Sequence, residues 1–166
     1  MTDLVATATK VVKTLTNRDL TLCTAESLTG GLLGASITEI PGASKVYLGG
    51  VVAYHSTMKA ILLHVDEADI AAHTVVSGEV AADMAYGVQS LTDGDWSIGV
   101  TGVAGPDAQD GHAPGEVWIS IVGPTVPSLP KFNLSHRFQF EGDRSAIREA
   151  TVNAALELLL RAISPV

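Results

Sequence analysis

Residues 24–31, Thr-Ala-Glu-Ser-Leu-Thr-Gly-Gly, bring a hydroxyl, a carboxylate and a pair of glycines into one short segment. An apolar, β-prone stretch precedes the segment and apolar residues at helical spacing follow it, which predicts a strand-to-helix junction. The first amides of such a helix favour an anion or a developing oxyanion, and glycines let that ligand approach closely. Ser27 is the candidate nucleophile, although serine here is also typical of a helix cap. The candidate substrate-binding residues of the segment are Glu26, Thr29, Gly30 and Gly31.

A serine hydroxyl needs a base or a proton relay, and residues 54–59, Tyr-His-Ser-Thr-Met-Lys, contain the best candidates. Lys59 can act as a base only if burial or nearby positive charge lowers its pKa, and Tyr54 can pass a proton between Lys59 and Ser27. The alternative is a solvated lysine on a helix and a tyrosine in a surface wall. Residues 56–59 also fit the S-x-x-K pattern, but its companion S-D-N and K-T-G elements are absent, so we treat the match as accidental.

Two further segments contain candidate binding residues. Residues 101–106, Thr-Gly-Val-Ala-Gly-Pro, follow a predicted strand, a favoured position for ligand contacts, although an ordinary tight turn also uses glycines. The segment is neither a G-x-G-x-x-G fingerprint nor a Walker loop. Arg144 opens the last predicted helix, where it either binds a phosphate or lies on the surface. The candidates are Thr101, Gly102, Gly105 and Arg144.

The elements that must position these residues follow from periodicity and caps. Helical spacing covers residues 4–15, 32–37, 58–63 and 78–91, and a closing helix follows Asp143 as its cap. The predicted strands are 20–24, 46–54, 96–101, 116–122 and 132–140, with a long loop from 102 to 115. This order predicts a single α/β domain over residues 1–166, with a three-layer α/β/α arrangement and a mixed central sheet.

Composition narrows the class of protein. The 166 residues have a formal net charge of −8, which argues against a general nucleic-acid binder because such binding needs clustered Lys and Arg. The single cysteine, Cys23, excludes an internal disulfide and cysteine-rich zinc sites, and the five histidines form no H-E-x-x-H pair, so we expect no required metal. We see no signal peptide and no membrane-spanning run, and we expect a cytoplasmic homo-oligomer that does not bind membranes.

Taken together and in order, these segments closely resemble the CinA carboxyl-terminal domain family, which includes the nicotinamide mononucleotide amidohydrolases. The resemblance spans nearly the whole chain and rests on residues 24–31, 49–54 with Lys59, 76–77, 102–106 and 142–144. It implies hydrolysis of the carboxamide of nicotinamide mononucleotide to nicotinic acid mononucleotide and ammonia, in pyridine nucleotide recycling and without a cofactor. It further implies Ser27 as the nucleophile and Tyr54 with Lys59 as its activating relay.

The same resemblance implies that amides near residues 29–31, with Thr101 and Gly102, hold the oxyanion or orient the substrate. Three positions depart from the family pattern: Leu28 stands where many members have cysteine, His55-Ser56 replaces the usual Ser-Asn, and residues 111–115 lack a common lysine. The last departure bears on substrate affinity and identity. The alternatives are therefore a non-catalytic nucleotide-binding or regulatory protein linked to competence or DNA damage, and an amidase for another small amide.

Overall fold

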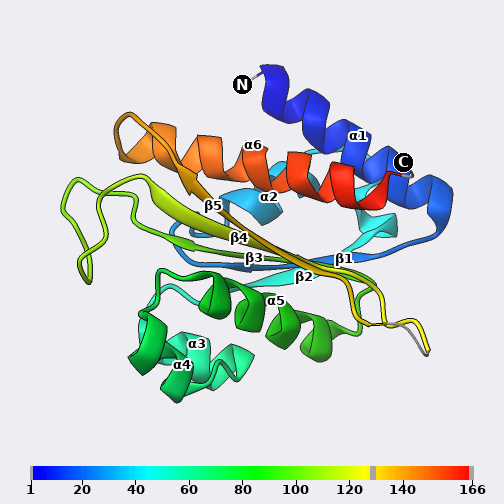
Figure 1. Ribbon diagram of the computed structural model, residues 1–166. Helices are drawn as coiled ribbons and strands as arrows, with labels where there is room; N and C mark the ends of the chain where they lie inside the picture. Colours follow the sequence, from blue (N-terminus) through cyan, green and yellow to red (C-terminus); the bar gives the residue numbers. More distant parts are fainter. Residues whose placement is uncertain (1, 128–129, 165–166) are drawn as a thin grey trace.

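The computed structural model, which describes residues 2–127 and 130–164, has three layers built around one five-stranded sheet (Figure 1). The strand order is β2-β1-β3-β4-β5. The strands are β1 (Leu22–Glu26), β2 (Tyr47–Val52), β3 (Trp96–Gly102), β4 (Glu116–Val122) and β5 (Asn133–Gln139). Strands β2, β1 and β3 run parallel, whereas β3, β4 and β5 pair antiparallel. The predicted α/β fold with a mixed sheet is confirmed.

Helices cover both faces of the sheet (Figure 1). One face carries α1 (Thr2–Arg18), α2 (Leu32–Thr38) and α6 (Arg144–Ile163), and the other carries α3 (Ser56–Leu63), α4 (Glu67–His73) and α5 (Gly78–Thr92). A 3₁₀ turn, η1 (Ala43–Lys45), precedes β2. None of the helices in the described part of the chain has the length and apolar character needed to cross a membrane.

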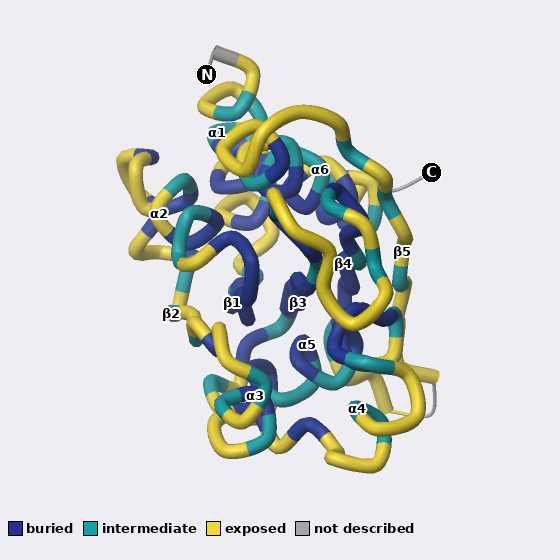
Figure 2. The backbone as a smooth tube through the Cα atoms, turned by 90° about the vertical axis from the view of Figure 1, so that its left-hand side faces the viewer, coloured by how far each residue is buried: buried dark blue, intermediate teal, exposed yellow. Residues whose placement is uncertain are grey.

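The central strands are buried, and the edge strands are not (Figure 2). Strand β1 is buried at all five positions, whereas β2 and β5 at the two edges expose side chains along their length. On the α5 face, Gly99 of β3 lets the helix lie directly on the sheet, because a Cβ there would be 2.1 Å from the carbonyl oxygen of Ala81. This close approach fixes the layer to which α3, the helix of Lys59, is attached.

Two boundaries near the cavity and one helix differ from the sequence-based expectation. Strand β1 ends at Glu26, two residues later than predicted, and α3 begins at Ser56 because the His55 side chain caps it by accepting a hydrogen bond from the Thr57 amide. Helix α4 was not predicted: Asp66 caps its first turn by accepting from the Ala68 amide, but the helix is only 7 residues long and buries none of its side chains. Such a helix has no apolar stripe from which periodicity could detect it.

Candidate active site

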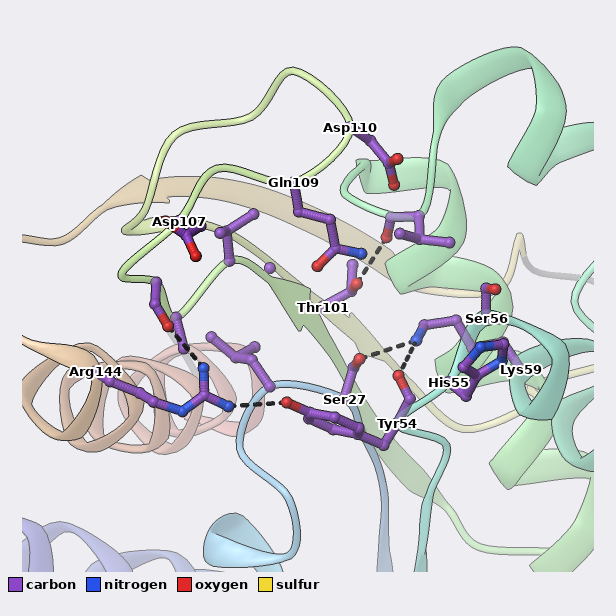
Figure 3. Close-up of a pocket in the computed structure, with 16 residues that line it drawn as sticks. Ser27, Tyr54, His55, Ser56, Lys59, Thr101, Asp107, Gln109, Asp110 and Arg144 are labelled. Carbon is purple, nitrogen blue, oxygen red and sulfur yellow. Dashed lines mark hydrogen bonds between the residues drawn. The ribbon is translucent and has the colours of Figure 1, made fainter.

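A cavity of about 420 Å³ lies at the edge of the sheet where the three parallel strands end (Figure 3). Ser27 follows β1, Tyr54 follows β2 and Thr101 lies at the end of β3, so residues distant in sequence meet at one place. Crevices at the carboxyl ends of parallel strands are the usual ligand sites of open α/β sheets. Lys59 completes the floor of the cavity from α3.

Lys59 contacts Ser27 directly. The Lys59 Nζ donates to Ser27 Oγ at 2.9 Å, to the Ala53 carbonyl at 2.9 Å and to the Tyr54 carbonyl at 3.4 Å. Lys59 is 1% exposed and Ser27 is 7% exposed. Within the described residues no carboxylate forms an ion pair with this lysine. Burial therefore lowers the pKa of Lys59 from its usual 10.5 to about 8.

This geometry gives the lysine a direct chemical role. A neutral amine can keep donating to two carbonyls while its lone pair accepts the proton of the Ser27 hydroxyl. The serine is itself held in place, because its amide donates to the Val100 carbonyl at 3.0 Å. A nucleophile and a base are thus within hydrogen-bonding distance before any ligand arrives.

The Glu26 carboxylate occupies the start of helix α2. Its Oε1 accepts from Thr29 Oγ1 at 2.7 Å and from two amides, and its Oε2 accepts from a third amide at 3.1 Å. The donating amides belong to Gly31, Leu33 and Gly34. The carboxylate, which is 2% exposed, therefore fills the anion site that we expected a substrate to use.

The structure does not bring four residues of this turn, which were predicted to bind substrate, to the lining of the cavity. The amide of Gly30 donates to the Ser27 carbonyl within the turn, so this amide is not available to a ligand. The cavity is lined by Ser27 and Leu28 but not by the residues around the α2 start: Glu26, Thr29, Gly30 and Gly31. These residues fold the turn that presents Ser27 and do not contact the cavity.

One amide beside the nucleophile remains available. No hydrogen bond within the described residues uses the amide of Leu28, which lines the cavity next to Ser27. The residue after a serine nucleophile is a common source of an oxyanion-binding amide. Arg148, which sequence analysis did not identify as a site residue, fixes this turn by donating to the Leu28 carbonyl at 3.0 Å and to the Thr29 carbonyl at 2.8 Å.

Tyr54 and Arg144 meet at the rim of the cavity (Figure 3). Arg144 donates to the Tyr54 hydroxyl at 2.8 Å and to the Gly105 carbonyl at 2.8 Å. Because Lys59 reaches Ser27 directly, the Tyr54 phenol does not lie between them, and the structure does not bring this phenol into the predicted relay. Arg144 instead places a cation at the mouth of the cavity.

Of the remaining candidates, Gly102 and Gly105 line the cavity as expected, and Thr101 lines it with its hydroxyl already engaged. The Thr101 hydroxyl donates to the Val75 carbonyl at 2.6 Å, so it ties the end of β3 to the loop before α5 and is not free for a ligand. Sequence analysis missed Asp107, Gln109 and Asp110, which line the cavity from the long loop. The only available signal for them was the length of that loop.

The described residues contain no group of three or more histidine, cysteine or acidic side chains arranged to hold a metal ion. The cavity presents a buried hydroxyl and amine in contact, the open Leu28 amide beside them, polar side chains of the long loop and an arginine at the rim.

Comparison with known proteins gives one consistent family. The model of the CinA C-terminal domain matches residues 5–163. The chain is 41% identical over 152 residues to a CinA-like protein of Desulfotalea psychrophila, covering 91% of this chain and 35% of that protein. It is 39% identical over 154 residues to a CinA-like protein of Frankia casuarinae, covering 93% and 34%. The chain thus spans about a third of the length of these curated relatives.

Solved structures of similar length share the whole fold. The competence/damage inducible protein CihA from Agrobacterium tumefaciens is 31% identical, with a TM-score of 0.89, over 97% of this chain and 95% of that one. A CinA superfamily protein from Klebsiella pneumoniae is 29% identical, with a TM-score of 0.90, over 96% and 97%. Nearly all of the chain therefore corresponds to the fold of these structures.

Proposed function

Since this chain belongs to the CinA C-terminal domain family, we propose that it is an amidohydrolase that uses Ser27 as its nucleophile and Lys59 as its base. The proposed substrate is nicotinamide mononucleotide, whose carboxamide becomes a carboxylate with release of ammonia. The observation that carries the proposal is the 2.9 Å contact between the buried Lys59 Nζ and Ser27 Oγ. A lysine buried without an ion-pair partner is costly to a fold, and a base is the role that uses its lowered pKa.

The proposed reaction proceeds through an acyl-enzyme. Neutral Lys59 takes the proton of the Ser27 hydroxyl as Oγ bonds to the carboxamide carbon, and the carbonyl oxygen becomes an oxyanion beside the Leu28 amide. The Lys59 ammonium returns that proton to the leaving nitrogen, so the C–N bond breaks and ammonia departs. Water then attacks the ester with Lys59 as base, which regenerates the hydroxyl and releases the carboxylic acid.

The rest of the cavity suits a small nucleotide. A volume of about 420 Å³ lies within the range of small-molecule sites. Arg144 is the cation at its rim. A substrate phosphate would accept hydrogen bonds from the guanidinium in place of the Tyr54 hydroxyl and the Gly105 carbonyl. We propose that Tyr54 thereby positions Arg144 in the empty site.

The test is ammonia release from nicotinamide mononucleotide and a panel of small amides. Ser27→Ala should abolish turnover, because the hydroxyl that attacks is gone. Ser56→Ala is the matched control: Ser56 also lines the cavity, but it has no bond to Lys59. Turnover that survives Ser27→Ala would remove this serine from its role, and a wild-type protein inactive on every amide would refute the enzyme proposal.

A second candidate is a nucleotide-binding or regulatory protein without turnover, as the competence and damage names of the structural relatives suggest for those proteins. The observation that favours it lies in the long loop, where the family's lysine is missing and His112 bonds to Thr74 and Glu116 outside the cavity lining. Binding without turnover separates the two candidates: nicotinamide mononucleotide would raise the melting temperature while no ammonia appears. Turnover restricted to another member of the amide panel would instead identify a different small amide as substrate.

A further inference from the structure

The long loop between β3 and β4 contains a tight hairpin at its tip. Gln109 and His112 exchange both backbone hydrogen bonds, at 3.0 and 2.8 Å, across the two residues Asp110 and Gly111. Those two residues have positive φ values of 49° and 81°. An Asp-Gly pair with both residues in the left-handed region is the signature of a two-residue type I′ hairpin. The tip is therefore a defined structural unit within the loop.

Side chains fix this hairpin to the body of the protein. His112 bonds through Nε2 to Thr74 Oγ1 at 2.8 Å and through Nδ1 to Glu116 Oε2 at 3.0 Å. Arg137 of β5 donates to the other oxygen of the same carboxylate at 3.1 Å. One other loop and two strands thus hold His112, and His112 holds the residue paired with it across the turn, Gln109. A hairpin anchored in this way presents the Gln109 side chain in a preorganised position.

The Gln109 amide points into the same cavity as Ser27 (Figure 3). No hydrogen bond within the described residues uses its side chain, whereas the other exposed glutamine of the sheet edge, Gln139, donates to the Pro114 carbonyl. Asp110 lines the cavity beside it, and Arg144 lines it from α6. The loop side of the cavity therefore offers one amide that both donates and accepts, next to a carboxylate that accepts.

We infer that Gln109 determines specificity by binding the sugar hydroxyls of the substrate; this inference rests on the proposed function. With the carboxamide at Ser27 and the phosphate at Arg144, the ribose is the part of the nucleotide left to face the loop. A vicinal diol presents donors and acceptors together, which the Gln109 amide matches, and a carboxylate such as Asp110 is a common partner of a ribose hydroxyl.

Three amide substrates distinguish the contributions of the phosphate, the ribose and the nicotinamide ring to binding. Nicotinamide mononucleotide has ribose and phosphate, nicotinamide riboside has ribose alone, and 1-methylnicotinamide keeps the cationic ring and carboxamide but has neither. Gln109→Ala should raise KM about tenfold for the first two, the size expected for one lost hydrogen bond, with kcat nearly unchanged. KM for 1-methylnicotinamide should not change. Gln139→Ala removes the same kind of side chain from β5, outside the cavity lining and apart from the hydrogen bonds of the hairpin, and should leave KM for all three substrates unchanged.

Calorimetric binding to proteins carrying Ser27→Ala separates this inference from the proposed function. A loss of affinity for the nucleotide and the riboside in Gln109→Ala supports the inference. It does so even if the protein without substitutions releases no ammonia, because that result would refute only the proposed reaction. Unchanged KM and affinity in an active Gln109→Ala protein would overturn the inference alone. An equal loss on 1-methylnicotinamide would also overturn it, because the effect would not depend on the sugar. A protein that neither binds nor hydrolyses ribosylated amides would overturn both.

Discussion

The pH dependence of turnover is the sharpest consequence of the buried lysine. If Lys59 is the base, only its neutral form can take the Ser27 proton, so kcat/KM must follow the deprotonation of Lys59 in the free enzyme. Its pKa of about 8, lowered by burial, sets the position of that curve. Activity should therefore rise with pH through the neutral range and level off above the pKa.

The size of this pH effect follows from the shift in the pKa of Lys59. A drop from 10.5 to about 8 corresponds to about 3 kcal/mol of differential stabilisation of the neutral amine. At pH 7 about a tenth of the enzyme then has a neutral lysine, against roughly one part in three thousand for an unshifted side chain. Between pH 6 and 7 the predicted kcat/KM rises nearly tenfold, and between pH 7 and 9 it rises by about tenfold more before it levels off.

The assay is initial-rate ammonia release from nicotinamide mononucleotide between pH 6 and 10, with a check that the protein stays folded at each pH. Lys59→Arg is the informative variant, because it keeps a cation at the site but cannot deprotonate in this range. It should be inactive at every pH. A profile that is flat or falls between pH 7 and 9, or an active Lys59→Arg enzyme, would refute the assignment of Lys59 as base.

Four further predictions concern stability and the loop. Lys59→Met should raise the melting temperature at pH 7. This advantage should shrink between pH 8 and 10.5, because in that window the lysine of the unmutated protein keeps its proton only in the unfolded state. A pH-independent difference in melting temperature would contradict the lowered pKa of Lys59. Glu26→Gln should cost about 3 kcal/mol in chemical denaturation, since the amide cannot accept all four hydrogen bonds, whereas the exposed Glu39→Gln should cost almost nothing. Gly99→Ala should destabilise the fold by more than 3 kcal/mol, because its Cβ meets a backbone oxygen of α5 at 2.1 Å. Gly111→Ala meets no atom within 4 Å but occupies a φ of 81°, so it should cost about 1 kcal/mol and weaken binding of ribosylated amides; unchanged binding would argue against the hairpin as a preorganised element.

Element types and order were predictable because local chemistry agrees with the fold. Asp143, predicted as a cap, accepts a hydrogen bond from the Ala146 amide at the start of α6, and Ser77 accepts one from the Val80 amide at the start of α5. The central strands are rich in apolar residues and buried at nearly every position, as expected for strands covered on both faces. Residue types alone suggested the pairing of Ser27 with a lysine 32 residues away as a hypothesis. The direct hydrogen bond at 2.9 Å depends on how the fold places the two residues, which the sequence does not show.

The role of Glu26 was not predictable from its neighbours. Sequence analysis ended the first strand near Thr24 and treated the following residues as a turn. It therefore assigned their side chains to neither face of the sheet. The strand instead continues to Glu26. Since alternate residues of a strand point to opposite faces, two extra residues decide which side chain faces which helix. The direction of this carboxylate therefore follows from a strand boundary that sequence analysis placed two residues too early.

That alternation explains how adjacent residues serve opposite layers. Glu26 bonds to the amides of α2 on one face of the sheet, and Ser27 bonds to Lys59 of α3 on the other. The carboxylate lies one residue from the nucleophile, yet its four hydrogen bonds are all made to the α2 turn. Lys59 in turn has no carboxylate partner to raise its pKa. Anchoring the turn with a buried acid on the far face therefore fixes Ser27 rigidly while leaving the lysine free to lose its proton.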